Sequence, residues 1–135
     1  MAIYLDTSVL LHAILGTDAT AYRWFADVCE QERLVSSRLL RLEIERVMHR
    51  EALDANKVAE PFLQRIALIS IDDAILAAAG TIPEHIKTLD SIHLATLLRS
   101  DPEMKLATHD RNMIRVAASL GIKVIDPLEA VGDTQ

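Results

Sequence analysis

The chain has 135 residues, of which 50% are hydrophobic, 25% are charged and 4% are aromatic. This size and composition indicate one globular domain over residues 1–135 and exclude a two-domain protein. The 14 Lys and Arg against 20 Asp and Glu give a net charge of -6, which excludes nucleic-acid binding by the surface as a whole and leaves only local patches for it.

Cysteine usage and hydropathy indicate the compartment. The single Cys29 cannot form an internal disulfide, and no Cys/His cluster has the spacing of a zinc site. The longest apolar runs, such as Ile75 to Ala79, are far too short to span a membrane, and Met1 leads into a strand-like stretch without the basic start of a signal peptide. We therefore expect a cytoplasmic protein without a membrane partner.

The chain alternates strand-like and helical segments from end to end. In the first half the expected elements are a strand at Ala2–Leu5, a helix at Thr7–Leu15 closed by Gly16, a helix at roughly Ala19–Gln31, a strand at Leu34–Ser36, and a helix from its N-cap Ser37 to about Arg50. Helical signal then resumes at Asp54, where Pro61 should kink or restart the segment.

The second half continues this alternation. The expected elements are a strand at Leu68–Ile71, a helix at Asp72–Ala79, a helix at about Asp90–Arg99, a strand at Lys105–Thr108, a helix at Asp110–Leu120 ended by Gly121, and a strand at Ile122–Ile125. Such alternation predicts an α/β fold with a central, mainly parallel sheet flanked by helices.

Two aspartates follow predicted strands at the place where open parallel sheets bind ligands. Asp6 comes after Ala2–Leu5, and Asp110 comes after the strand that ends near Thr108. Both should therefore emerge at the carboxyl edge of the sheet. The alternative is that each aspartate only caps the helix that follows it.

Glu43 lies on the inward arc of its predicted helix, between Leu39 and Val47 on the helical wheel, whereas Glu45 points outward. A buried, unpaired carboxylate is costly, so an inward glutamate needs a metal, an Arg partner or a raised pKa. The alternative is that Glu43 pairs with Arg46 or Arg50 on the same stripe.

Asp90 opens another helix and aligns with Leu94 and Leu97, which makes it both an N-cap candidate and a carboxylate on a core-facing stripe. His93 follows one turn later. It could bind a metal, but a lone His at such a position is more often a packed residue whose ring nitrogens are hydrogen-bonded, and this is the interpretation that we favour.

Four carboxylates thus converge on one predicted sheet edge: Asp6, Glu43, Asp90 and Asp110. Oxygen-only ligands select hard cations, so Mg²⁺ or Mn²⁺ is the expected cofactor. Such a site can activate water and stabilise the leaving oxygen in phosphodiester hydrolysis. Arg46 and Arg50 are candidate phosphate contacts, with an ordinary solvated helix face as the alternative.

The segment with Tyr22, Trp24 and Phe25 carries more aromatic surface than one short helix needs. It is most simply core, and the alternative is a groove that binds a protein partner. In that case the partner should bury Trp24 and place a cation, an Arg for preference, among the four acids.

The sequence as a whole resembles the PIN-domain ribonucleases, specifically the VapC-type toxins of toxin–antitoxin modules. The resemblance rests on four motifs in order: IYLDTSVL at the start, a helical glutamate near one-third of the chain, LDSIHLAT, and ATHDRNM followed by AASLGIKVIDP. It implies a metal-dependent endoribonuclease in which Asp6, Glu43, Asp90 and Asp110 hold Mg²⁺ or Mn²⁺. It further implies supporting hydroxyls on Thr108 and Ser8.

The same resemblance implies partners: an RNA substrate, an antitoxin that wraps the toxin and blocks its site, and a second copy of the chain in a homodimer. One position departs from some family members, because Asn112 stands where they carry a further acid, and this leaves one versus two metal ions open.

Two other functions compete with the ribonuclease. A receiver-like regulatory domain has a similar length and an acidic Mg²⁺ pocket, but it would need adjacent acids after the first strand, where Thr7 and Ser8 follow Asp6. A catalytically silent PIN-like module that only binds a protein is the other alternative. The presence of all four acids favours the enzyme.

Overall fold

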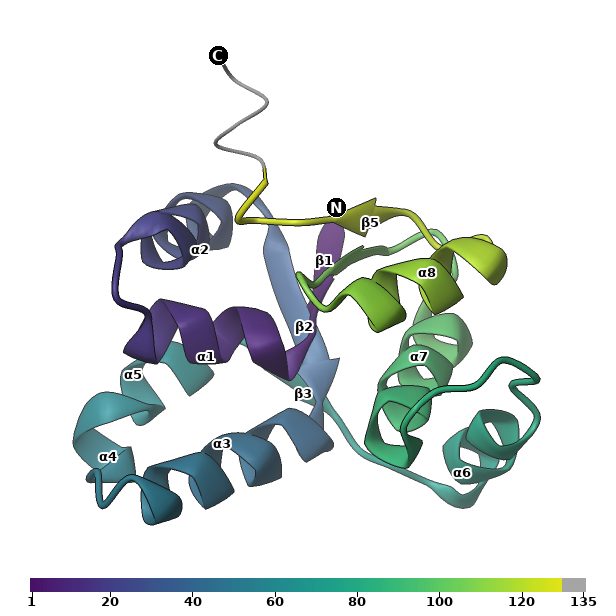
Figure 1. Ribbon diagram of the computed structural model, residues 1–135, viewed down its shortest axis with the longest axis horizontal. Coiled ribbons are helices and arrows are strands. Elements are labelled where there is room, and N and C mark those ends of the chain that lie inside the picture. Colours follow the sequence, from purple (N-terminus) through teal and green to yellow (C-terminus); the bar gives the residue numbers. More distant parts are fainter. Residues whose placement is uncertain (130–135) are drawn as a thin grey trace.

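The structure, a computed structural model, describes residues 1–129 and has a five-stranded parallel sheet at its centre (Figure 1). The strand order is β3-β2-β1-β4-β5, and every neighbouring pair is parallel. The strands are β1 (Ala2–Leu5), β2 (Arg33–Ser37), β3 (Ala67–Ile69), β4 (Lys105–Ala107) and β5 (Val124–Ile125). The predicted α/β class and the parallel sheet are therefore confirmed.

The helices follow the predicted alternation closely. They are α1 (Thr7–Leu15), α2 (Thr20–Gln31), α3 (Arg38–Arg50), α4 (Ala55–Val58), α5 (Glu60–Leu63), α6 (Asp73–Gly80), α7 (Thr88–Ser100) and α8 (Arg111–Ser119). Pro61 restarts the helical segment, because it occupies the first turn of α5, where its missing N–H has no helical partner to lose.

Two strand boundaries differ from the prediction by two residues, each for a local reason, and the other strand boundaries agree to within one residue. The third strand ends at Ile69, not at residue 71, because its partner strand β2 ends at Ser37 opposite Ile69 and offers no further ladder positions. The last strand begins at Val124, not at residue 122, because the Ile122 N–H bonds back to the Ala117 carbonyl at the end of α8. Gly121 makes this return with a φ of +79°.

The strand order places a topological switch beside β1. From β1 the chain builds β2 and β3 on one side, and later β4 and β5 on the other, so the carboxyl ends of β1 and β4 flank the point where the connections diverge. Leu5 pairs with Ala107 across these strands, and the Asp6 N–H donates to the Ala107 carbonyl at 3.0 Å. Asp6 and Thr108 therefore stand side by side at the edge where such folds bind ligands.

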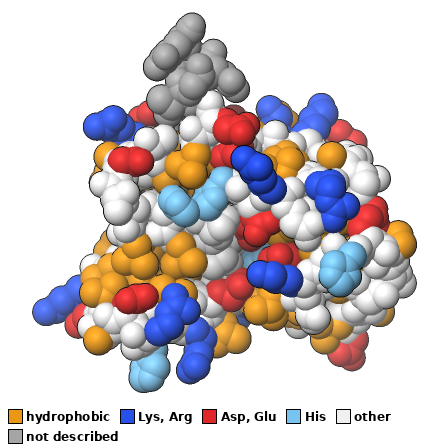
Figure 2. Space-filling model, in the orientation of Figure 1, with side chains coloured by type: hydrophobic (Ala, Val, Ile, Leu, Met, Phe, Trp, Pro, Cys, Tyr) orange, Lys and Arg blue, Asp and Glu red, His pale blue; other side chains and the backbone are white. Residues whose placement is uncertain are grey.

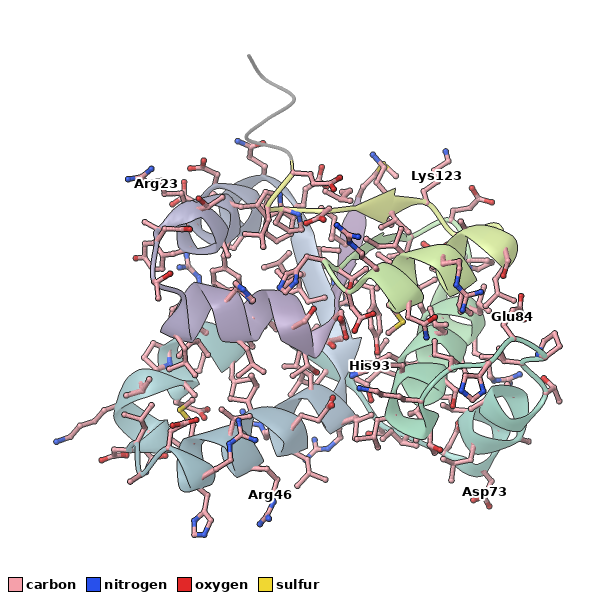
Figure 3. The ribbon with its side chains drawn as sticks, viewed as in Figure 1. Arg23, Arg46, Asp73, Glu84, His93 and Lys123 are labelled. Carbon is pink, nitrogen blue, oxygen red and sulfur yellow. The ribbon has the colours of Figure 1, made fainter. Side chains whose placement is uncertain are left out.

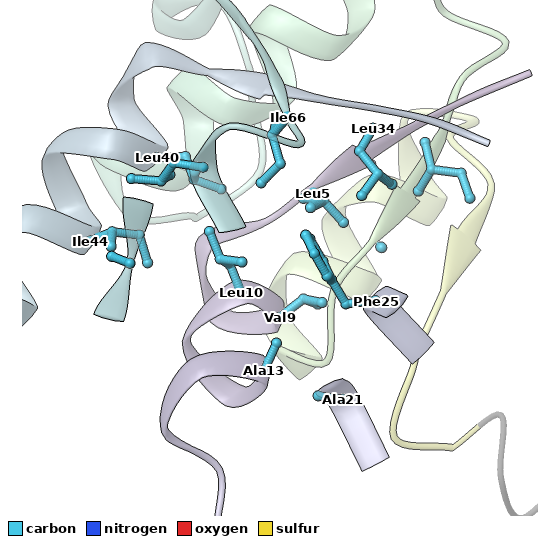
Figure 4. Packing of buried hydrophobic residues seen from close by; sticks show 14 of the residues in the cluster. Leu5, Val9, Leu10, Ala13, Ala21, Phe25, Leu34, Leu40, Ile44 and Ile66 are labelled. Atoms are coloured by element: carbon cyan, nitrogen blue, oxygen red, sulfur yellow. The ribbon is translucent and has the colours of Figure 1, made fainter. Parts of the chain in front are cut away.

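Two hydrophobic cores lie on opposite faces of the sheet. Alternation along β1 sends Ile3 and Leu5 into a core with residues of α1, α2, α3 and α5, shown in Figure 4, and sends Tyr4 into a core with residues of α7 and α8. Figure 1 shows α1 to α5 on one side of the molecule and α6 to α8 on the other. The carboxyl edge of β1 thus opens between α1 and α3 on one side and α7 and α8 on the other.

The aromatic segment on α2 is divided between core and surface. Phe25 is buried, Trp24 packs partly buried against the same core, and Tyr22 is 51% exposed. Tyr22 and Phe25 line a small cavity together with Phe62, whereas Trp24 is not among its lining residues. The core interpretation thus holds for Phe25 and Trp24, and Tyr22 lines the surface cavity.

Among residues 1–129, no helix is long and apolar enough to cross a membrane.

Candidate active site

All four predicted carboxylates line a single cavity of about 360 Å³ at the switch point. They come from four different parts of the fold: Asp6 after β1, Glu43 on α3, Asp90 on α7 and Asp110 at the start of α8. Figure 2 shows acidic side chains gathered in the hollow near the centre of this face. The convergence expected at the sheet edge is therefore present.

Asp6 is held by two hydroxyl groups and does not cap a helix. It occupies the N-cap position of α1, but its side chain makes no capping hydrogen bond. Its Oδ2 instead accepts from Ser8 Oγ at 2.7 Å and from Thr108 Oγ1 at 2.8 Å, and the residue is only 4% exposed. The capping alternative is therefore wrong for the Asp6 side chain.

Glu43 is half-buried and is held through one of its two oxygens. Its Oε1 accepts from Thr7 Oγ1 at 2.6 Å and from His93 Nε2 at 2.8 Å. Burial raises the pKa of Glu43 most strongly, but the hydrogen bonds from His93 and Thr7 outweigh burial and hold the pKa below its ordinary value. The alternative pairing with Arg46 or Arg50 is wrong, because α1 and α7 supply nearer donors.

Asp90 does not open its helix as predicted. The first helical residue of α7 is Thr88 and the N-cap is Lys87, whose carbonyl accepts from the Ser91 N–H. Asp90 therefore lies within the first turn, and its side chain does not serve as a cap. Burial, and next the negative charges of Asp6 and Asp110, raise the pKa of Asp90 to about 6.

Asp110 combines the two roles that the sequence left open. Its Oδ1 accepts from the Met113 N–H at 3.0 Å and so caps α8, while the residue also lines the cavity. The Asp110 N–H donates to Thr108 Oγ1 at 3.1 Å, and that hydroxyl donates in turn to Asp6. Thr108 thus connects the two aspartates that follow β1 and β4.

His93 confirms the favoured interpretation of a packed, hydrogen-bonded histidine. It is 0% exposed, with Nδ1 2.8 Å from the Tyr4 hydroxyl and Nε2 next to Glu43 and Thr7. The sequence analysis did not predict the hydrogen bonds of Tyr4 with His93 or of Thr7 with Glu43 and His93. Strand alternation could have placed Tyr4 on the same face as Asp6, but its contact with a residue 89 positions away follows only from the fold.

Among residues 1–129, the basic residue that lines this cavity is Lys87, which the sequence analysis did not single out. Arg46 is exposed and points away from His93, as Figure 3 shows. Arg50 is also exposed and lines a different cavity, and its Nε lies 3.6 Å from Oε1 of Glu51. Contacts of Arg46 and Arg50 with the substrate remain a prediction, and such contacts would lie on the surface outside the acidic cavity. Asn112 accepts from Arg115 and does not line the cavity.

The chemistry of the donors fits a hard divalent cation. The four acids supply oxygen ligands only, and burial, followed by the negative charges of Asp6 and Asp110, raises the pKa of Asp90. Within residues 1–129, however, no three carboxylate, imidazole or thiol groups stand in a ready-made coordination arrangement. Some of the acidic side chains would therefore have to turn before they could share an ion.

Comparison with known proteins identifies the family. The model of the PIN domain matches residues 3–119, and the chain therefore belongs to the PIN-domain family. It is 34% identical over 129 residues to Ribonuclease VapC46 of Mycobacterium tuberculosis, which covers 93% of this chain and 98% of that protein. The predicted resemblance to this family is confirmed.

Solved structures share the fold. VapBC2 from Rickettsia felis bound to a promoter DNA fragment matches with a TM-score of 0.73 and 14% identity, covering 93% of this chain and 98% of that one. A toxin–antitoxin complex from Klebsiella pneumoniae matches with a TM-score of 0.69 and 16% identity, and the match covers 93% of this chain and 97% of that one. The receiver-like alternative is wrong, because that fold has strand order 2-1-3-4-5, whereas this sheet runs 3-2-1-4-5.

Proposed function

We propose that this chain is a metal-dependent endoribonuclease that hydrolyses RNA phosphodiester bonds as the toxin of a type II toxin–antitoxin module. The observation that carries the proposal is the convergence of four carboxylates from four separate elements on one cavity at the switch point of the sheet. Similarity over nearly the whole chain to a protein named as a ribonuclease supports the same activity.

In this proposal Asp6, Glu43, Asp90 and Asp110 hold Mg²⁺ or Mn²⁺. The bound cation would activate water for attack on phosphorus and stabilise the leaving oxygen. The protein itself supplies orientation: Ser8 and Thr108 fix Asp6 by their hydroxyl groups. Lys87, at the N-terminus of α7, brings a positive charge to a cavity that would otherwise repel phosphate.

An antitoxin is the proposed protein partner. Two of the solved structures that share the fold are a VapBC protein on promoter DNA and a toxin–antitoxin complex. Without a cation the four acids carry a formal charge of -4. An Arg side chain of the partner that enters the cavity would reduce the repulsion between these acids and at the same time exclude the metal. A homodimer is proposed as well, and light scattering of the purified chain tests it.

The test of the function is cleavage of RNA by the purified chain with Mg²⁺, with Mn²⁺ and with a chelator, followed by sequencing of the RNA ends. We expect cleavage that requires the metal and leaves discrete ends. Binding of an antitoxin without any cleavage would instead support the catalytically silent module. Cleavage that persists in excess chelator would contradict the metal-dependent mechanism.

A further inference from the structure

A buried chain of hydrogen bonds runs behind the cavity to Glu43 and ends on one of its two oxygens. Tyr4 from β1, His93 from α7 and Thr7 from α1 form it, with His93 Nδ1 2.8 Å from the Tyr4 hydroxyl and Nε2 2.8 Å from Glu43 Oε1. Thr7 Oγ1 donates to the same Oε1 at 2.6 Å. Within residues 1–129, the other oxygen, Oε2, accepts no hydrogen bond.

The direction of this chain follows from the chemistry of its two ends. The Thr7 hydroxyl donates to Glu43 Oε1, so this oxygen acts as an acceptor and offers no proton to the His93 ring. His93 must therefore carry its proton on Nε2. A neutral His93 ring with its proton on Nε2 has an unprotonated Nδ1, which accepts a hydrogen bond from the Tyr4 hydroxyl 2.8 Å away.

Packing leaves the His93 ring no freedom to turn. His93 and Tyr4 are both 0% exposed, and their rings meet edge to face with centroids 5.7 Å apart. His93 does not line the cavity, whereas Thr7 and Glu43 do. His93 therefore reaches the cavity lining through its Nε2, which lies 2.8 Å from Glu43 Oε1 and 3.2 Å from Thr7 Oγ1.

We propose that His93 and Thr7 are positioning residues, which clamp Oε1 of Glu43 so that Oε2 is presented to a divalent cation in the cavity. This inference rests on the proposed metal-dependent function. The physical reason is orientation: a glutamate fixed by two donors loses little side-chain freedom when it binds an ion, whereas an untethered one loses more. Removal of such outer hydrogen bonds in metal sites weakens metal binding about 10–100-fold.

The test compares two amides at position 93. In His93→Gln the amide nitrogen can occupy the place of Nε2 and donate to Glu43, whereas in His93→Asn the shorter side chain reaches only the place of Nδ1. Mn²⁺ binding is measured by titration calorimetry on the full chain, and stability by urea unfolding. We expect His93→Asn to weaken Mn²⁺ binding at least about tenfold and His93→Gln to stay within about threefold of the original protein.

A second pair keeps the test decisive if His93→Asn fails to fold. Thr7→Val preserves the shape of the side chain but removes the donor to Glu43, and Thr7→Ser preserves the donor. We expect only Thr7→Val to weaken Mn²⁺ binding. In a Glu43→Gln background, either donor-removing change should have no further effect on Mn²⁺ binding, because the carboxylate through which it acts is gone.

The outcomes separate this inference from the proposed function. Equal Mn²⁺ affinities within both pairs, in a protein that binds Mn²⁺ and cleaves RNA, would overturn the positioning role and leave the function standing. Absence of Mn²⁺ binding by the original protein would overturn both. Full additivity of His93→Asn with Glu43→Gln would show that His93 acts elsewhere and would also overturn the inference.

Discussion

The two sides of the acidic cavity hold their carboxylates in different ways. On one side, Asp6 and Glu43 each accept two hydrogen bonds at a single oxygen, from Ser8 and Thr108 or from Thr7 and His93. On the other side, within residues 1–129, Asp90 accepts no side-chain or capping hydrogen bond, and its pKa is raised to about 6.

This difference teaches how a crowded acidic site stays folded without a bound cation. Asp6 and Glu43 are paired with donors supplied by the protein, whereas Asp90 has no such donors among residues 1–129, and burial and next the charges of Asp6 and Asp110 raise its pKa. We call Asp6 and Glu43 the anchored pair. A cation would add ligand interactions to the anchored pair and reduce the repulsion around Asp90. We therefore expect Asp90→Asn to stabilise the metal-free fold and Asp6→Asn to leave its stability nearly unchanged.

The largest effect is expected for Asp6→Asn. An amide keeps one oxygen to accept from Ser8 and Thr108, so the fold should persist, but it removes the negative charge that binds the cation. We expect RNA cleavage to fall by about 10³-fold or more, with thermal unfolding close to that of the original chain. Loss of both fold and cleavage would mean that Asp6 is mainly structural, and an unchanged rate at matched metal would sink the proposed site.

Glu43→Gln should reduce cleavage by about 10²-fold, and Glu45→Gln is its matched control. The two glutamates are two residues apart on α3, but Glu43 lines the cavity and Glu45 is exposed. We expect Glu45→Gln to change the rate less than about twofold. Cleavage rates at saturating Mg²⁺ measure this, and equal losses would remove the distinction between the anchored pair and the outer face of α3.

Asp90→Asn should also reduce cleavage strongly, but it should stabilise the metal-free fold. The folded chain binds the Asp90 proton more tightly than the unfolded chain, whose Asp pKa is 3.8. Proton binding by Asp90 therefore adds fully to the free energy of unfolding below about pH 4, and this contribution is lost as the pH rises through about 6. At pH 8 we expect Asp90→Asn to raise the free energy of unfolding by about 1 kcal/mol, a value reduced for solvent screening.

Urea unfolding of both proteins in chelator, at pH 4.5 and at pH 8, measures this effect. The gain in stability should shrink at the lower pH, since the original Asp90 is protonated there. A destabilised Asp90→Asn protein at pH 8 would contradict the claim that burial and neighbouring negative charges disfavour the ionised Asp90.

The smallest effects are expected for the basic residues. Lys87 lines the cavity and Arg46 does not. Lys87→Ala should therefore raise the KM for RNA about threefold. It should also reduce the slope of log binding constant against log salt concentration by about one. Arg46→Ala should change KM less. KM measured at several salt concentrations tests this order, and a larger effect at Arg46 would show that RNA follows the outer face of α3.

Much of the fold follows from patterns that are local in the chain. Apolar spacing, helix-ending glycines and the N-cap Ser37, which accepts from the Leu39 N–H, were enough to predict the order of strands and helices. The inward direction of Glu43 also follows from its own helix, because the helical period alone places it among core positions. Helix and strand periodicities depend on neighbouring residues, so a single sequence contains this information.

What holds each carboxylate depends on residues far apart in the chain. The donors to Glu43 come from 36 and 50 positions away, and Thr108 reaches Asp6 across 102 positions. The start of α7 at Thr88 and the position of Lys87 at the cavity likewise depend on how α7 packs against α6 and β2. These contacts form only when the parallel strands pair in register, because side-chain hydrogen bonds need positions set to within a few tenths of an ångström, which no local periodicity specifies.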